Sequence, residues 1–331
     1  MPFRYVPILR SKAGEATALH NLDAAAKQRV FPVIRLTAAV PATFAGRMAG
    51  AWVGRDLALD GYYSLTQTGS TVPLQSLANT LTAAGVHVLP SIRVGAPAPY
   101  IAAIQHMRQQ SQGRLVVLAR LGDMATLDAW LISINATPPA ADLVIVAGHV
   151  PDYGAGALDP VVTHSLQTLP NPANWRSITL ASSAAPRDYA PFPLGLSSVS
   201  RLDWVLWQAV HPAVQFQLDY GDYGIAHPDM TEPPGVAMVR ASVSAKYTLD
   251  TTWLIAKGQQ VTGPMGVPMP TQYLGHANAL VAQPGFGGVP NCWGDTRIQA
   301  ITAHTASPGS RATWVEVGVN RHLSLVTDRL P

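Results

Sequence analysis

The chain has 331 residues, of which 48% are hydrophobic and only 12% are charged, about half the charged share usual for a soluble domain. This length allows one large α/β unit or two smaller domains, and the hydrophobic content excludes a disordered chain. The net charge is +3 and no run of Lys or Arg occurs, so the charge alone does not indicate nucleic-acid binding. Arg far outnumbers Lys, and Arg is suited to bidentate recognition of phosphate and carboxylate groups.

Cysteine usage and hydropathy indicate a cytoplasmic location. Cys292 is the only cysteine, which excludes a disulfide framework and a thiolate metal cluster. No apolar run approaches the ~18 residues that a membrane span requires. The N-terminal residues lead straight into an apolar strand and lack a signal-peptide cleavage pattern. We therefore expect a cytoplasmic protein with no membrane partner.

Eight short apolar runs recur through the first two thirds of the chain. They cover residues 5–9, 31–34, 52–59, 86–89, 115–118, 143–146, 177–180 and 214–218. Several are continuously apolar rather than alternating, which is typical of parallel strands covered on both faces. The pattern therefore indicates a parallel sheet.

Helical periodicity fills the intervals between these runs. Leu74, Leu77, Ala78 and Leu81 follow the helical spacing, with Pro73 in the first turn. Further segments with this spacing cover residues 127–134, 158–166 and 202–209, and residues 200–203 (SRLD) predict a capping box for the last. Strand followed by helix, eight times, predicts a (β/α)₈ TIM-like barrel. An open doubly wound sheet is the alternative.

The final third departs from this rhythm. Residues 239–247 and 252–258 predict a β-hairpin around Leu249-Asp250, and residues 273–282 and 297–304 predict helices. No linker separates these segments from the rest. We therefore expect a single domain over residues 1–331, with eight βα units in 1–228 and a C-terminal hairpin and helices in 229–331 that complete or cap the barrel.

The positions just past the strands of such a barrel face its functional rim. They hold Arg10, Arg35, Asp60, Arg93, Arg120, His149, Ser182 and Asp219. Guanidinium groups that converge on one mouth would attract an anion, and phosphate matches their geometry. Alternatively, the aspartates pair with the arginines in a structural network. Because side chains alternate along a strand, about half of these residues are expected to point elsewhere.

Residues 218–228 (LDYGDYGIAHP) gather chemically active groups after the last strand. Asp219, Asp222 and His227 are candidate catalytic acid–base groups, or ligands for a hard metal such as Mg²⁺. The alternative is a well-hydrogen-bonded turn at the end of a core strand.

More distant residues could join this stretch through folding. Asp295 and His322 are candidate ligand-binding residues of this kind, and aromatic residues of the second half, including Tyr223 and Trp293, could stack nucleobases. Residues 154–159 (GAGALD) could offer backbone N–H groups to a phosphate, although a plain loop is the alternative.

Familiar catalytic and metal motifs are missing from the sequence. The ten histidines include no HxH or HExxH pair, which argues against zinc, while Mg²⁺ stays a candidate and the metal itself is left open. No nucleophile elbow or P-loop pattern occurs. Common hydrolase and kinase chemistry is therefore disfavoured.

Several motifs together resemble the beta-family proteins of bacteriophages and bacteria. They are YVPILR at 5–10, WRSITLA at 175–181, RLDWVLW at 201–207, GDYGIAHP at 221–228, Lys246-Tyr247, WGD at 293–295 and ATWVEVGVNRH at 312–322. The family pattern usually has Glu where Arg35 stands and His where Arg321 stands. The resemblance implies a phage or antiviral-defence setting, often beside a nuclease-like protein that is a candidate partner.

Three functional hypotheses follow. In the first, the barrel mouth binds a phosphate-bearing ligand, a nucleotide or nucleic acid, held by Arg10, Arg93 and Arg120, with phosphodiester chemistry if the protein is an enzyme. In the second, the protein is a non-catalytic interaction module of phage–host conflict that uses residues 239–258 as its partner surface. The third is a barrel that binds a neutral sugar or small metabolite.

Overall fold

The computed structural model describes residues 3–153, 158–229, 231 and 242–331. Eight parallel strands close into a barrel in the order β1-β2-β3-β4-β5-β6-β7-β9. They are β1 (Tyr5–Arg10), β2 (Val33–Arg35), β3 (Asp56–Asp60), β4 (His87–Arg93), β5 (Leu115–Arg120), β6 (Ala141–His149), β7 (Ser177–Ser183) and β9 (Leu218–Asp222). Each strand overlaps one of the eight apolar runs. The predicted (β/α)₈ barrel is therefore confirmed, and the open sheet is excluded.

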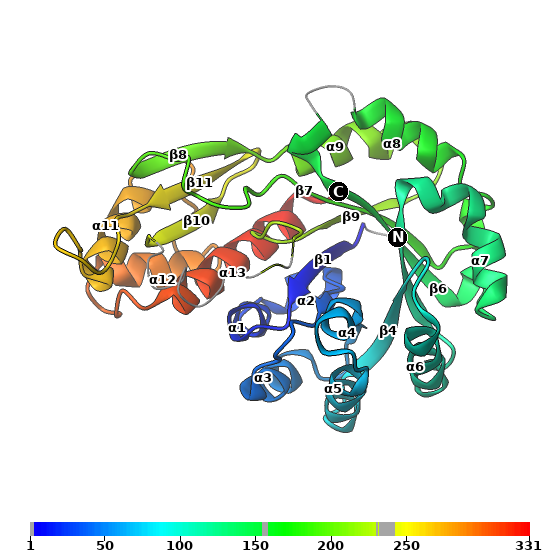
Figure 1. Ribbon diagram of the computed structural model, residues 1–331. Coiled ribbons are helices and arrows are strands. Elements are labelled where there is room, and N and C mark those ends of the chain that lie inside the picture. The colour runs from blue at the N-terminus through cyan, green and yellow to red at the C-terminus, as the bar shows by residue number, and fades with distance from the viewer. Residues whose placement is uncertain (1–2, 154–157, 230, 232–241) are drawn as a thin grey trace.

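Helices follow the strands and lie on the outside of the barrel (Figure 1). They are α1 (Ala13–His20), α2 (Ala24–Arg29), α3 (Ala42–Trp52), α4 (Tyr62–Thr68), α5 (Val72–Ala83), α6 (Ala98–Gln110), α7 (Leu127–Ser133), α8 (Leu158–Gln167) and α9 (Leu202–Val210). In α5, the spaced residues Leu74, Leu77, Ala78 and Leu81 are all buried, as their periodicity predicts.

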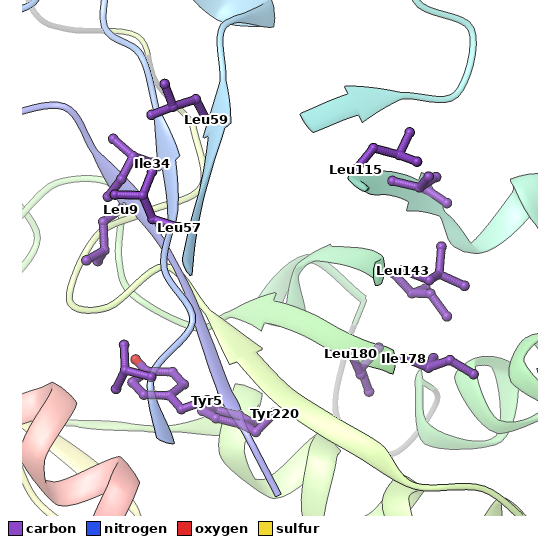
Figure 2. Close-up of a cluster of buried hydrophobic side chains, with 14 of the residues drawn as sticks. Tyr5, Leu9, Ile34, Leu57, Leu59, Leu115, Leu143, Ile178, Leu180 and Tyr220 are labelled. Carbon is purple, nitrogen blue, oxygen red and sulfur yellow. The ribbon is translucent and has the colours of Figure 1, made fainter. Parts of the chain in front are cut away.

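Side chains of the barrel strands alternate between two apolar clusters. Val6, Ile8, Val33 and Ala58 belong to the cluster inside the barrel. The intervening residues, among them Tyr5, Leu9, Ile34, Leu57, Leu59 and Tyr220 (Figure 2), belong to the larger cluster, which also contains buried helix residues such as Leu19 and Leu74. By this alternation Arg10, Arg35 and Asp60 fall on the inner face. Arg10 is paired with Arg35 and Arg35 with Asp60 on neighbouring strands, so the three residues lie side by side at the mouth.

A C-terminal unit packs beside the barrel (Figure 1). Its antiparallel sheet has the order β10-β11-β8, formed by β10 (Ser244–Thr248), β11 (Thr252–Lys257) and β8 (Gly195–Ser200). Its helices are α11 (Met269–Val281), α12 (Trp293–Thr302) and α13 (Arg311–Arg329). Tyr247, Tyr273, Ile298 and Trp314 belong to a hydrophobic cluster separate from that of the barrel. We refer to β8, β10, β11 and α11–α13 as the C-terminal unit.

Helix α13 connects this unit to the barrel. The Asn320 side chain donates a hydrogen bond of 3.1 Å to the carbonyl of Ala18 in α1. At Gly318, a Cβ atom would lie 2.9 Å from the Lys246 carbonyl oxygen and 2.9 Å from Cδ1 of Ile225. Only glycine permits this approach of α13 to β10 and to the segment after β9.

The C-terminal predictions have mixed outcomes. The hairpin is confirmed where it is described, and α11 and α12 match the two predicted helices. Helix α13 and strand β8 were not predicted. The predicted capping box is wrong, because α9 begins after Arg201 without a side-chain cap and Asp203 turns into a buried cluster.

Residues 154–157 and 239–241, parts of two predicted segments, lie outside the described residues. Among the helices of the described ranges, none is both long and apolar enough for a membrane crossing.

Candidate functional site

A cavity of about 1070 Å³ lies between the mouth of the barrel and the C-terminal unit. The barrel contributes the carboxyl ends of β1 and β2 and the segment after β9. The C-terminal unit contributes β10, β11 and the first turns of α13, and residues 187–194 line a further wall. The cavity is therefore at the end of the barrel where barrel enzymes keep their active sites.

Positive charge dominates the described lining of this cavity. Seven cationic residues contribute to it: Arg10, Lys12, Arg35, Arg187, Lys246, Lys257 and Arg311. Only two carboxylate residues do so, Glu15 and Asp188. Since the whole chain carries a formal charge of +3, the cavity holds more positive charge than the protein as a whole. Such a lining raises the local concentration of anions.

Asp60 ties together the arginines at the barrel mouth. Its Oδ2 atom lies 2.7 Å from Arg93 and 3.1 Å from Nε of Arg35, and its Oδ1 atom accepts a bond from the backbone N–H of Tyr62. Although burial raises the pKa of Asp60, Arg93 and Arg35 outweigh this effect and lower it to about 2. Asp60 is fully buried, so its role here is to hold the arginines in place rather than to touch a ligand.

Arg10 and Arg35 both reach the cavity from the mouth of the barrel. The Arg10 guanidinium donates a hydrogen bond of 2.8 Å to the carbonyl of Asp229. Arg35 lies 5.2 Å above the ring of Tyr223, which also lines the cavity. Arg93 belongs to the same network but does not line the cavity. Four predicted ligand-binding positions, Arg10, Asp60, Arg93 and Tyr223, are thus brought together at the mouth, and Arg10 and Tyr223 line the cavity.

Lys246 enters the cavity from β10. Its amine donates a hydrogen bond to the carbonyl of Ile225 and lies 5.0 Å from the centre of the Tyr189 ring. Burial lowers the pKa of Lys246 and Arg10 lowers it further; although Glu15 raises it, the pKa stands at about 7. Lys246 is therefore neutral in a large fraction of molecules at neutral pH.

His227 also lines the cavity. Its ring centre lies 4.4 Å from that of His149, at the end of β6. The Nδ1 atom of His227 accepts a hydrogen bond of 3.0 Å from the backbone N–H of Asp229. This bond leaves the proton of a neutral imidazole on Nε2. Among the three predicted catalytic residues, His227 is the one that the structure places at the cavity.

Asp219 lies at the opposite end of the barrel. Strand β9 begins at Leu218 rather than ending there, so Asp219 faces the barrel interior at the amino end of the strand. It accepts hydrogen bonds from the backbone N–H and from Nε of Arg4, at 2.9 and 3.1 Å. Arg4 also pairs with Asp142 at 3.0 Å. Asp219 thus belongs to an ion-pair network at the amino end of the barrel.

Asp222 is on the outer face of β9, because side chains alternate along the strand and Asp222 shares the face of Leu218 and Tyr220. It accepts hydrogen bonds from the Tyr5 hydroxyl at 2.6 Å and from the backbone N–H of Gly224 at 2.8 Å. Nε2 of His322 lies 2.7 Å from its other oxygen. Burial raises the pKa of Asp222, but His322, Tyr5 and Arg201 together lower it more, and the net shift is downward. Asp222 and His322 therefore meet, as the sequence suggested, but in a dry cluster outside the cavity.

Three further predicted residues also lie outside the cavity. Asp295 is buried and pairs with Arg321 at 3.0 Å, and Trp293 packs on the core of the C-terminal unit. Arg120 is exposed at the end of β5, where its backbone N–H donates to Asp123. The sequence predicted none of the cavity cations Lys12, Arg187, Lys246, Lys257 and Arg311.

The sequence alone gives no local signal for these residues. The chain has only four lysines, at positions 12, 27, 246 and 257, and three of them line the cavity. Their concentration is visible only after folding, because β10 and β11 are far from α1 in the sequence. No group of three or more His, Cys, Asp or Glu side chains that could hold a metal occurs among the described residues, so the structure assigns no metal ligand set.

Comparisons with known proteins place the chain in a family. No curated protein matches the sequence significantly. Among solved structures, a mutant tryptophan synthase alpha-subunit from the hyperthermophile Pyrococcus furiosus is similar, with 10% identity, 67% of this chain and 89% of that chain covered, and a TM-score of 0.38. The model of the family described as Beta protein matches residues 5–328, nearly the whole chain. The chain therefore belongs to the Beta protein family.

Proposed function

We propose that the cavity binds a phosphate-bearing ligand, a nucleotide or a short segment of nucleic acid. The observation that supports this most directly is the excess of cationic over acidic side chains in its lining. Arginine and lysine are the residues that bind phosphate, arginine through its planar fork and lysine as a point charge. Charges that are partly removed from water act on an anion more strongly than exposed charges do.

The size and the aromatic walls of the cavity support a nucleotide over a smaller anion. A volume of about 1070 Å³ is at the upper end of the range for small-molecule sites. Tyr189, a half-buried ring, contributes to the lining, and rings of this kind stack on nucleobases, whereas Tyr223, Tyr273 and Trp314 also line the cavity but are buried. The family resemblance gives the proposal its biological setting, which is the conflict between phages and bacteria.

The proposal is one of binding rather than of phosphodiester cleavage. The predicted acid–base trio would have to act on one substrate, but Asp219 lies at the amino end of the barrel and Asp222 points outward. His227 lines the cavity without either carboxylate. A general base must lie within hydrogen-bond reach of the proton that it removes, and a trio separated in this way does not meet that condition.

Titration calorimetry with ATP, inorganic pyrophosphate and a short single-stranded oligonucleotide tests the proposal, with and without Mg²⁺. Affinity is expected to fall as the salt concentration rises, because counterions compete with phosphate for the cations. The variant Arg10→Gln is expected to bind about tenfold more weakly, the effect of losing one charge-assisted contact.

Arg120→Gln is the matched control. Arg120 also follows a barrel strand but is exposed and outside the cavity, so its replacement should leave the affinity unchanged. Equal losses in the two variants, or no salt-sensitive binding of any of the three probes, would refute the proposal. The second result would favour a non-catalytic protein-interaction role.

A further inference from the structure

The lysines of this protein differ in their surroundings although three of them line one cavity. Lys257, on β11, donates hydrogen bonds to the carbonyls of Ala190 at 2.8 Å and Phe192 at 2.6 Å. Lys27 lies outside the cavity on α2, where its amine donates to the carbonyl of His20. Both lysines are therefore useful references for Lys246.

The amine of Lys246 is held without a carboxylate partner among the described residues. Its direct contacts are with neutral groups, the carbonyl of Ile225 and the ring of Tyr189. The guanidinium of Arg10, from β1, and the carboxylate of Glu15, from α1, act on it from the barrel side, and Arg10 has the larger effect. A half-buried lysine beside a second cation loses its proton near neutral pH and becomes nucleophilic.

We propose that Lys246 condenses with the carbonyl group of a compound that also bears a phosphate, forming an imine within the cavity. This inference rests on the proposed function, because the surrounding cations would hold the phosphate. In the first step the nitrogen lone pair forms a bond to the carbonyl carbon, the C=O π electrons move to oxygen, and a proton passes from nitrogen to oxygen through water. The carbinolamine then loses its hydroxyl group and the remaining proton of the nitrogen as water while the nitrogen lone pair forms the C=N bond, and the products are one imine and one water molecule.

The position of Lys246 relative to the other cations supports this class of substrate. Arg10 and Lys257 line the same cavity and could neutralise a phosphate, whereas Arg187 also lines it but pairs with Asp229 at 2.7 Å. The aldehyde or ketone carbon of the same molecule could then approach an amine that burial and Arg10 keep partly deprotonated. Arg10 would thus contribute both to binding the substrate and to activating the nucleophile.

Reductive trapping of the intact protein tests this inference, with pyridoxal 5′-phosphate as the phosphate-bearing aldehyde. Borohydride converts an imine to a stable secondary amine, and peptide mass mapping then identifies the modified lysine. At pH 7.5 we expect modification of Lys246, at least about tenfold above that of Lys12, Lys27 and Lys257, with suppression by excess inorganic phosphate. Pyridoxal without phosphate should react at least about tenfold more slowly, because it lacks the group that the cations bind.

Two conservative variants complete the experiment. Lys246→Arg keeps the charge and should abolish the adduct while phosphate still binds, whereas Lys257→Arg should keep the adduct on Lys246. Modification spread evenly over the four lysines, or unchanged total modification in Lys246→Arg, overturns the inference. If the wild-type protein binds phosphate and pyridoxal phosphate without an adduct on Lys246, the inference fails and the proposed function stands. Equal reaction of pyridoxal and pyridoxal phosphate at Lys246 overturns the phosphate requirement, and with it the proposed function.

Discussion

The cavity and the Asp222–His322 cluster both lie between the barrel and the C-terminal unit, and both contain charged groups, but they balance charge differently. In the cluster, the carboxylate of Asp222 faces His322 and two tyrosine hydroxyls, and Nδ1 of His322 is 3.1 Å from the hydroxyl of Thr248. In the cavity, cations outnumber carboxylates. The charged groups of the cluster hydrogen-bond to one another, whereas the cavity lining has an excess of cations that could bind an anionic ligand.

Hydrogen counting in the cluster explains how it holds two carboxyl groups. The Tyr220 hydroxyl lies 2.7 Å from Asp203 and 2.9 Å from Asp222, but a phenol has one hydrogen to donate. Burial raises the pKa of Asp203 despite the opposing effect of Arg201, so Asp203 is the carboxyl group that holds a proton more readily. With a proton on Asp203, that carboxyl group can donate to Tyr220 while Tyr220 donates to Asp222; without it, the one hydrogen of Tyr220 is donated either to Asp203 or to Asp222. In this protein, buried charged groups that hydrogen-bond to one another therefore have a structural role, which is to hold the barrel and the C-terminal unit together.

The largest expected effect comes from breaking this cluster. Asp222→Ala leaves the imidazole of His322 buried without its acceptor and should lower the free energy of unfolding by about 3–5 kcal/mol. Urea unfolding at pH 7 measures the change. The native pKa of Asp222 is lowered, so its contribution is present above the unfolded pKa and is lost as the pH falls through the folded value.

Asp250→Ala is the control for this prediction. Asp250 pairs with Arg329 at 2.9 Å, but both side chains are more than half exposed, and the loss should stay within about 1 kcal/mol. An Asp222 variant that is no less stable than the Asp250 variant would show that the cluster does not hold the barrel and the C-terminal unit together.

Asp219→Asn should have the next largest effect, on stability alone. It weakens the two hydrogen bonds from Arg4 at the amino end of the barrel, and a loss of about 1–3 kcal/mol is expected for bonds to a charged group. Affinity for ATP should not change, because the cavity lies at the other end of the barrel. Urea unfolding and calorimetry on the same samples separate the two quantities. A large loss of ATP affinity in a stable, folded variant would show that Asp219 contributes to ligand binding.

The barrel could be predicted from sequence because its signals are local. Each strand is a short apolar run, each helix has its own apolar stripe, and the repeat of the two specifies the order. Helix α13 has no such signal, since Asn320, Arg321 and His322 are buried along with the apolar residues of its second half. Their partners, such as Asp222 and Asp295, are distant in sequence. A helix buried through polar contacts therefore does not look amphipathic.

The site was predictable only in part, for a related reason. Arg10 follows an apolar strand whose end is clear, and the structure places it at the cavity. For the last barrel strand, the apolar run at 214–218 precedes β9 except for Leu218, which shifts the expected strand end by four residues. That error assigned Asp219 to the mouth. Lys246 and Lys257 come from a sheet whose position against the barrel is a tertiary property, so no local pattern indicates it.

Lys257→Met should reduce ligand affinity with little loss of stability. Removing one half-buried cation from the cavity is expected to weaken ATP binding about tenfold, which corresponds to about 1.4 kcal/mol. Calorimetry at low and high salt should also show a smaller salt dependence, because one fewer charge is neutralised. Lys27→Met removes a lysine outside the cavity and should change neither quantity. An unchanged affinity in Lys257→Met would mean that its ammonium serves only the carbonyls of Ala190 and Phe192.

The remaining expected effect is a pH dependence of stability that arises from Lys246 in the cavity. The pKa of Lys246 is lowered to about 7 in the folded protein, so between that value and the ordinary value of 10.5 the unfolded chain binds more protons. The stability of the folded protein should therefore rise with pH across this interval, by no more than about 1.4 kcal/mol per pH unit for one group. Lys246→Met removes this contribution, so the difference in unfolding free energy between wild type and variant should increase from pH 7 to pH 9. Arg10 and Glu15 are the charged groups that act on this amine. A difference that does not vary with pH would mean that Lys246 keeps its proton, and the cavity would then contain seven fixed cations and no nucleophilic amine.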